Sequence, residues 1–196
     1  MKLPSQKKEL RVAIRAKLRT LPEVAQQTGA ERARTLLEGQ TIWQRAHRIL
    51  FYAPMPCELD IWPLLEDAIR SGKEAYLPRF EGASYLASRV TNIHTDLTSG
   101  QFGIREPVPG SPQIPLNRLD FVLVPGIAFD LQGRRLGRGK GYYDRLLAEV
   151  RGTTCGVAFD EQIVEELPVE PHDIHLNCIL TPTRWIEFPG HRAVLK

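Results

Sequence analysis

The start of the chain carries apolar side chains at helical spacing. One stripe of the first segment is apolar: Leu10, Ile14, Leu18 and Leu21. A second stripe of the same segment is basic: Lys7, Arg11 and Arg15. This spacing predicts an amphipathic helix with one basic edge. A second helix is predicted from Pro22, which suits a first helical turn, to about Glu38, although Gly29 weakens that prediction.

The next part of the chain alternates strand, helix and strand. His47–Ala53 (HRILFYA) is apolar and aromatic and stops at Pro54, which is typical of a buried strand. Asp60 is a candidate cap for the helix that follows, and that helix is predicted to stop at Gly72. Glu74–Pro78 predicts another strand. Because such a crossover almost always joins parallel strands, the predicted fold class is α/β.

The remainder of the chain continues this alternation. Leu119–Pro125 (LDFVLVP) is the clearest central strand. The other predicted elements are a helix over Tyr142–Val150, a strand over Thr154–Phe159, a short helix over Asp160–Leu167 and a strand over Cys178–Thr181. Residues 80–118 are rich in Gly and Pro and predict a hairpin or irregular excursion. We therefore expect one open three-layer domain over residues 1–196, with a mostly parallel central sheet flanked by helices.

Composition narrows the class of protein. Hydrophobic residues make up 42% of the 196 positions and charged residues 25%, which is the balance of a globular protein with a sizeable core. The cysteines Cys57, Cys155 and Cys178 are odd in number and widely spaced. This pattern favours reduced thiols in a cytoplasmic protein over a disulfide framework. The longest apolar run is too short to cross a bilayer, so we expect no membrane association.

Charge is placed unevenly along the chain. The net charge of +3 is modest, but bases gather in residues 7–19 and 134–145, which indicates an anionic ligand. A nucleic-acid binder would carry a larger positive excess with aromatic residues among the bases, so nucleic acid is not an expected partner. We expect a monomer that acts on small molecules. A basic, amphipathic N-terminus also suits a mitochondrial transit peptide, but we treat it as part of the fold.

A basic glycine loop lies between the central strand and the next helix. From Arg134 to Asp144 it reads RRLGRGKGYYD, in which Gly137, Gly139 and Gly141 alternate with bases. Glycines let backbone amides approach a phosphate, and the N-terminus of the following helix attracts anions. The loop matches neither a Walker A nor a Rossmann fingerprint. On pattern alone, a tight turn with a solvated basic face is an equal alternative.

A phosphate loop that lacks the Walker hydroxyl must take Mg²⁺ ligands from carboxylates elsewhere. Asp144, one turn into the helix, is one candidate. Asp173, in the polar loop before the last strand, is the second, with turn capping as its alternative role. His172 and His175 lie close to Asp173, but this trio lacks a clear third and fourth ligand for a transition metal.

Glu58 follows the first predicted strand, at the edge where open α/β sheets bind ligands. A carboxylate at this position can orient a substrate. The same carboxylate would also favour the positive N-terminus of the next helix. Position alone leaves both roles open.

The run from Leu123 to Leu147, LVPGIAFDLQGRRLGRGKGYYDRLL, resembles the signature of the 5-formyltetrahydrofolate cyclo-ligase family, also called methenyltetrahydrofolate synthetases. Three further segments resemble the family in order: KKELR (7–11), CELD (57–60) and LPVEPHDIHLNCILTPTR (167–184). The resemblance implies conversion of 5-formyltetrahydrofolate to 5,10-methenyltetrahydrofolate with ATP and Mg²⁺, releasing ADP and phosphate. Two alternatives stay open: a paralogue with another substrate, and a non-catalytic nucleotide- or RNA-binding protein.

The resemblance also implies site residues. ATP contacts are expected at Lys7, Lys8, Arg11, Arg135, Leu136, Gly137, Arg138, Gly139, Lys140, Gly141, Tyr142 and Tyr143. Substrate contacts are expected at Ala53, Glu58 and Tyr142, and magnesium ligands at Asp144 and Asp173. Lys140 is expected at the γ-phosphate during transfer, with Arg138 as a second catalytic cation. Core packing is expected for at least one of the two tyrosines.

Three positions depart from the family's pattern. Asn177 and His175 stand where many relatives have aspartate and proline, and Ile61 stands where many have threonine. If Asn177 matches a metal-associated aspartate, one anionic ligand is missing, and the affinity for magnesium is then expected to be weaker.

Overall fold

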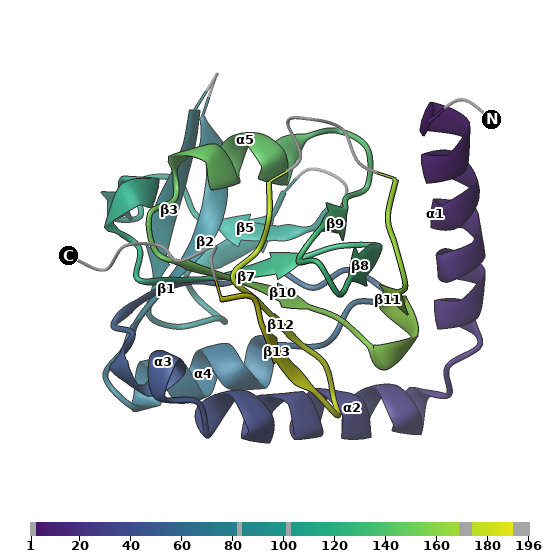
Figure 1. Ribbon diagram of the computed structural model, residues 1–196. Coiled ribbons are helices and arrows are strands. Elements are labelled where there is room, and N and C mark those ends of the chain that lie inside the picture. Colours follow the sequence, from purple (N-terminus) through teal and green to yellow (C-terminus); the bar gives the residue numbers. More distant parts are fainter. Residues whose placement is uncertain (1–2, 82–83, 101–102, 169–173, 190–196) are drawn as a thin grey trace.

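The computed structural model describes residues 3–81, 84–100, 103–168 and 174–189. They form an eight-stranded sheet with helices on both faces (Figure 1). The strand order is β13-β12-β10-β7-β1-β2-β3-β6. The five central strands are β12 (Cys178–Leu180), β10 (Thr153–Val157), β7 (Phe121–Pro125), β1 (Arg48–Leu50) and β2 (Glu74–Glu81). Neighbours in this group are parallel, which confirms the predicted α/β class.

Antiparallel strands extend the sheet at both edges. These are β13 (Trp185–Glu187), β3 (Ser84–Val90) and β6 (Gln113–Ile114). A separate two-stranded ribbon joins β4 (Leu97–Ser99) to β5 (Arg105–Pro107). The predicted hairpin in the Gly- and Pro-rich part of the chain is therefore confirmed.

Helices cover both faces of the sheet (Figure 1). One face carries α2 (Glu23–Glu38), α3 (Thr41–Arg45) and α4 (Trp62–Arg70), and the other carries α5 (Tyr142–Glu149). Helix α1 (Leu3–Arg19) stands upright at one side of the molecule. No helix within the described ranges combines the length and the apolar character needed to cross a bilayer.

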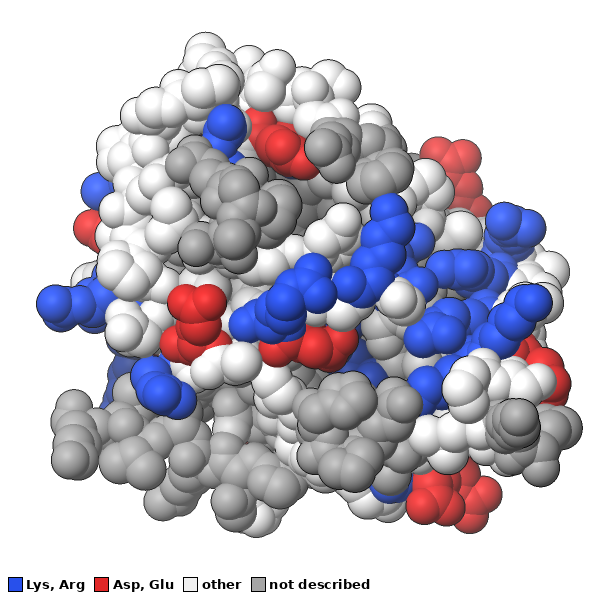
Figure 2. All heavy atoms as spheres, turned by 90° about the horizontal axis from the view of Figure 1, so that it is seen from above, with Lys and Arg blue, Asp and Glu red and all other residues white. Residues whose placement is uncertain are grey.

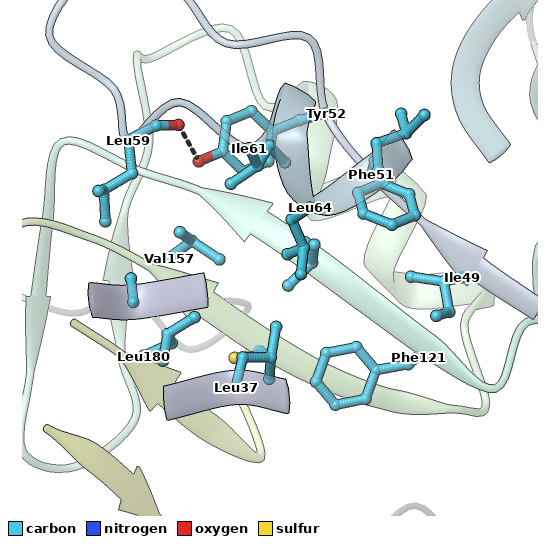
Figure 3. Packing of buried hydrophobic residues seen from close by; sticks show 14 of the residues in the cluster. Leu37, Ile49, Phe51, Tyr52, Leu59, Ile61, Leu64, Phe121, Val157 and Leu180 are labelled. Carbon is cyan, nitrogen blue, oxygen red and sulfur yellow. Dashed lines mark hydrogen bonds between the residues drawn. The ribbon is translucent and has the colours of Figure 1, made fainter. Parts of the chain in front are cut away.

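Alternate residues of the central strands pack on opposite faces of the sheet, as the two-residue period of a strand requires. Ile49 and Phe121 belong to the cluster beneath α2 and α4, whereas Leu50 and Val122 belong to the cluster beneath α5. Figure 3 shows part of the first cluster, in which Leu64 of α4 lies between the strands and the loop above them. All five residues of β7 are buried.

Gly29 lies in the middle of α2, where glycine normally weakens a helix. A β-carbon at this position would come within 3.3 Å of side-chain atoms of both Phe159 and Pro182. The helix therefore uses glycine to approach closely the segments that follow β10 and β12.

Two predictions about helix boundaries are wrong. The helix predicted over Asp160–Leu167 is a single 3-10 turn, Asp160–Gln162, followed by the short strand β11 (Ile163–Val164). Gln162 explains the change, because its buried amide accepts the N–H of Phe159 and donates to Gly126 and Ile127 carbonyls. The cap of α4 is Ile61 rather than the predicted Asp60, and the helix begins at Trp62, although Asp60 does accept the N–H of Trp62 at 2.9 Å.

A small second sheet was not predicted. It contains β11, β8 (Ala128–Asp130) and β9 (Arg135–Leu136) in the order β11-β8-β9. Strand β8 pairs in parallel with β11 and antiparallel with β9. The β8–β9 hairpin carries the chain from the end of β7 into the basic loop.

Candidate functional site

The basic loop packs against the first helix. The Nε atom of Arg11 donates to the carbonyl oxygen of Gly137 at 2.9 Å, which joins positions 126 residues apart. A β-carbon at Gly139 would lie 3.6 Å from the guanidinium carbon of Arg11, so the loop backbone passes close to this side chain. Lys7 lies one turn earlier on the same face of α1, and the neighbouring Lys8 is exposed. The two basic segments of the sequence therefore meet.

Lysine and arginine side chains gather on the face that contains the loop. Figure 2 shows this face from above, and a band of basic side chains crosses it toward the side on which α1 stands in Figure 1. Arg138 and Lys140 of the loop are exposed. A concentration of cations on one face attracts anionic ligands.

Glycine gives the loop its backbone conformation. Gly139 has φ +104° and Gly141 has φ +65°, values that L side chains rarely adopt. Gly141 is also the residue that precedes α5, where it supplies no capping side chain. Backbone N–H groups at a helix N-terminus are orphan donors and favour anions. The loop therefore combines a close-approach backbone with the positive end of a helix.

Glu58 and Arg138 form an ion pair across the site. Nη2 and Nε of Arg138 donate to Oε1 of Glu58 at 2.7 and 3.2 Å. The Glu58 side chain is only 8% exposed, whereas that of Arg138 is 37% exposed. The other carboxylate oxygen of Glu58 accepts the N–H of Met55 at 3.0 Å. The expected substrate contact is thus joined directly to the expected ATP loop.

The segment that presents Glu58 is tied to the end of β1. The hydroxyl of Tyr52 donates to the carbonyl of Leu59 at 3.0 Å (Figure 3). Burial, with a smaller contribution from the charge of Glu58, raises the pKa of Tyr52 and keeps it a hydrogen-bond donor. Among the described residues, Cys57 is the only non-glycine with a positive φ, at 68°, and such strain is concentrated at ligand sites. Ala53 lies half-buried at the start of this segment.

Arg135 and Asp144, which the resemblance assigns to ATP and to magnesium, bind each other. Nη2 of Arg135 donates to Oδ1 of Asp144 at 2.6 Å, and Nη1 donates to the carbonyl of Pro125 at 3.3 Å. The Arg135 side chain is 5% exposed, so it braces the loop against β7. The second oxygen of Asp144 is oriented toward the loop, because a β-carbon at Gly141 would lie 3.9 Å from it.

The two tyrosines differ in environment. Tyr143 packs against both core clusters, and burial raises its pKa, with the charge of Glu58 adding to the effect and that of Arg135 opposing it. Tyr142 is 41% exposed, and the Nζ atom of Lys140 lies 5.9 Å from the centre of its ring. Core packing is therefore confirmed for Tyr143, and Tyr142 is the tyrosine that a ligand can reach.

One expected ATP contact, Leu136, does not present its side chain to a ligand. Leu136 is buried in the core, and its carbonyl accepts the N–H of Ile127 at 2.8 Å, so it contributes framework. Asp173 lies outside the described residues, as does His172. Within the described ranges, no three or more His, Cys, Asp or Glu side chains group together as metal ligands would.

A cavity adjoins Glu58, and none of the residues that line it belongs to the basic loop. It has a volume of about 390 Å³ and lies between α2 and the segment that begins α4. Its floor is apolar, with Leu64, Val157 and Leu180, and its rim is polar, with Gln26, Arg34 and Glu58 itself. This cavity could not be predicted from the sequence, because the polar residues of α2 have the spacing of an ordinary solvent-facing side.

The three departures from the family's pattern have structural roles. Oδ1 of Asn177 accepts hydrogen bonds from the N–H and the hydroxyl of Thr154 at 2.7 and 2.9 Å. Nδ1 of His175 lies 3.1 Å from the carbonyl oxygen of Gln132. Ile61 is buried in the core. Asn177 therefore acts at the start of β10 in this chain.

Comparisons with known proteins agree with this geometry. The model of the 5-formyltetrahydrofolate cyclo-ligase family matches residues 4–182. A 5-formyltetrahydrofolate cyclo-ligase from Mycolicibacterium smegmatis is 34% identical over 192 residues, covering 93% of this chain and 97% of the relative. The enzyme of the same name from Escherichia coli K12 is 36% identical over 178 residues, covering 87% and 97%.

Solved structures lead to the same family. The NMR structure of a 5,10-methenyltetrahydrofolate synthetase from Aquifex aeolicus matches with a TM-score of 0.87 at 35% identity, covering 95% of this chain and 94% of the other. A Mycoplasma pneumoniae synthetase, 22% identical, shares the fold with a TM-score of 0.72 over 90% and 98% of the two chains. Its sequence, its fold and its basic loop together show that the chain belongs to the 5-formyltetrahydrofolate cyclo-ligase family.

Proposed function

We propose that this chain closes the ring of 5-formyltetrahydrofolate in an ATP-dependent reaction that yields 5,10-methenyltetrahydrofolate, ADP and phosphate. Its family supports this reaction. The observation that carries the assignment to particular residues is the Arg138–Glu58 pair. It brings the phosphate loop within 2.7 Å of the carboxylate expected to contact folate, as a reaction between a nucleotide and a folate requires.

In the proposed reaction, the formyl oxygen attacks the γ-phosphorus of ATP and ADP leaves. The neighbouring folate nitrogen then attacks the activated carbon and loses its proton, and phosphate departs with the former formyl oxygen. The task of the protein is to hold the two substrates in line and to offset charge on the transferring oxygens.

The cations of the loop divide this task. Lys140 is exposed on a flexible stem and is assigned to the γ-phosphate, where a mobile point charge can follow the transferring group. Arg138 has five N–H donors in a planar fork, and Glu58 orients that fork by binding Nε and Nη2. Arg11, held by the Gly137 carbonyl, closes the loop from the side of α1 and is assigned to ATP together with Lys7 and Lys8.

The carboxylate chemistry of the site suits Mg²⁺. Asp144 places one oxygen on Arg135 and the other toward the loop. Mg²⁺ in nucleotide sites is bound by one or two carboxylates plus phosphates and waters, so Asp144, with Asp173, would be a sufficient protein ligand set. When bound, the ion would offset the negative charge of the phosphates.

The same proposal includes the oligomeric state and the cellular compartment. Large exposed hydrophobic residues are scattered over the described chain, at Leu3, Val12, Val24, Leu131 and Tyr142, which supports a monomer acting on small molecules. All three cysteines are thiols, which supports a reducing, cytoplasmic setting. Light scattering of the purified chain tests the monomer.

The reaction is tested by mixing the chain with Mg-ATP and 5-formyltetrahydrofolate and recording the near-ultraviolet absorbance of the methenyl product. We expect an ATP-dependent rise. Lys140→Ala is expected to lower kcat on the order of a hundredfold, the usual effect of removing one charge-stabilising group. Lys17→Ala, an exposed lysine near the end of α1, is the matched control and should keep normal turnover.

Each outcome has a distinct meaning. A well-folded wild-type chain that shows no ATP-dependent absorbance rise refutes the reaction itself. Normal turnover in Lys140→Ala would leave the reaction standing and remove Lys140 from the transfer step.

A further inference from the structure

Asp130 is a fully buried carboxylate at the end of β8, outside the set of site residues considered so far. Its Oδ1 atom accepts the N–H groups of Gln132 and Arg134 at 3.0 and 3.1 Å. Its Oδ2 atom accepts Nε of Arg134 at 2.6 Å and the N–H of Leu167 at 3.0 Å. A carboxylate has about four lone-pair sites, and all four are used.

These four hydrogen bonds organise the entrance to the phosphate loop. Arg134 directly precedes β9, and β9 leads into Gly137, the residue that Arg11 holds from α1. The position of β9 relative to β8 therefore fixes where the loop begins. Arg135, the next residue, reaches both Pro125 and Asp144, so a shift at Arg134 would be passed to the loop.

The same hairpin also holds the chain on either side of residues 169–173. On the near side, Leu167 is bound by Asp130 itself. On the far side, the N–H of Leu176 donates to the carbonyl of Gly133 at 2.8 Å, and His175 lies 3.1 Å from that of Gln132. Two segments that are distant in sequence are thus attached to one turn, and Asp130 is its buried centre.

Turn formation alone does not account for this arrangement. An aspartate that only closes a turn needs the two local N–H bonds, and an asparagine makes them as well. The bond to Leu167 spans 37 residues. Burying a charge is costly unless it is paired and hydrogen-bonded, and here the charge is used to join the loop entrance to a remote segment.

We propose that Asp130 is a positioning residue for ATP: its buried carboxylate, through Arg134 and Leu167, sets the place of the phosphate loop without touching substrate. This inference rests on the proposed function. Its consequence is that loss of the charge impairs ATP binding while leaving folate binding nearly intact, because Glu58 is held by the N–H of Met55, and its segment by the hydroxyl of Tyr52, rather than by the hairpin.

The test compares Asp130→Asn with Asp120→Asn. Asp120 accepts bonds from His47 and Arg48 at the start of β1, so its variant also loses a structural carboxylate but lies outside the hairpin. Titration calorimetry with Mg-ATP is run on each folded variant. We expect the ATP Kd to rise about tenfold in Asp130→Asn, the scale of a displaced binding group, with little change in the KM for 5-formyltetrahydrofolate. Asp120→Asn should keep the wild-type ATP Kd.

A second variant and a second measurement keep the proposal testable if the first variant does not fold. If Asp130→Asn does not fold, Arg134→Lys, which keeps the charge but loses the planar Nε donor, should raise the ATP Kd by a smaller factor. Amide hydrogen exchange should accelerate across Gly137–Gly141 in whichever variant folds, and not in Asp120→Asn.

The outcomes separate the two proposals. An unchanged ATP Kd in the folded hairpin variant overturns the positioning role, and so does an equal rise in Asp120→Asn. A wild-type chain that binds no ATP overturns the proposed function, and the positioning role with it.

Discussion

Two guanidinium–carboxylate pairs involve the phosphate loop, one at its start and one within it, and they differ in how they are buried. In the Asp130–Arg134 pair the side chains are 0% and 13% exposed, and the carboxylate makes four hydrogen bonds. In the Glu58–Arg138 pair the carboxylate is 8% exposed, but the guanidinium is 37% exposed. The first pair is enclosed by the fold, whereas the second meets solvent at the site.

This difference in burial indicates that the first pair supports the loop structurally and that the second is available to contact a ligand. Breaking a buried pair leaves an uncompensated charge and is strongly destabilising, whereas a pair with one exposed partner contributes little to stability. The Glu58–Arg138 pair can therefore exchange partners when a ligand binds, at small energetic cost. The Asp130–Arg134 pair cannot, and it provides the fixed position from which the loop extends.

The largest expected effect is on stability and concerns the buried Asp130–Arg134 pair. Arg134→Met should lower the free energy of unfolding by about 3–5 kcal/mol, because the Asp130 charge stays buried without its cation. Arg138→Met should lower it by about 1 kcal/mol or less. Urea denaturation of both variants measures the difference. Equal losses would mean that the two pairs do not differ in the way their burial indicates.

A smaller effect concerns Asp120, a carboxylate that directly precedes the central strand β7. Partial burial alone would raise its pKa, but hydrogen bonds from Arg48 and His47 and the charge of Arg48 outweigh this and lower it. A lowered folded-state pKa contributes stability above the unfolded-state pKa, and this stability is lost as pH falls through the folded-state pKa. Asp120→Asn should therefore be less stable than wild type by about 2 kcal/mol at neutral pH.

The measurement is a pair of denaturation curves across the acid range. The difference between wild type and Asp120→Asn should shrink as pH falls and vanish once Asp120 is protonated in both states. A difference that stays constant at low pH would assign the effect to packing rather than to charge.

The smallest expected effect is on substrate binding and concerns the partly exposed Glu58–Arg138 pair. Glu58→Gln removes the charge but keeps the shape, and we expect the KM for 5-formyltetrahydrofolate to rise about tenfold, or about 1.4 kcal/mol. The KM for ATP should change little. Steady-state kinetics with each substrate varied in turn provide the test, and an unchanged folate KM would contradict the role of Glu58.

Local pattern was enough to predict most of the fold. The apolar runs of β7 and β10 and the amphipathic stripe of α1 were predicted because a strand or helix buried on a known face repeats at its own period. The 3-10 turn at Asp160–Gln162 was missed because a single buried amide, Gln162, replaces the helical hydrogen bonds with long-range ones. Such bonds depend on where Gly126 lies in space, and the local sequence carries no trace of that.

The candidate site shows the same limit. The loop and Glu58 could be singled out from residue type and from position at the ends of strands. The pairing of Arg135 with Asp144 could not, because both residues have chemistry that suits a nucleotide and magnesium as well as each other. Asp130 could not be singled out either, because an aspartate three residues before Gly133 resembles an ordinary turn former. Its importance depends on a partner 37 positions later.

The bond between Arg11 and the Gly137 carbonyl also orders events during synthesis. Helix α1 is synthesised before the loop, and its Arg11 contact must wait until 126 more residues have been added. Contacts of such separation carry a loop-closure cost that is recovered only late in folding. We therefore expect the nascent chain to build its sheet and its hairpin before α1 docks, so that Arg11 is made before the loop but reaches its partner late in folding.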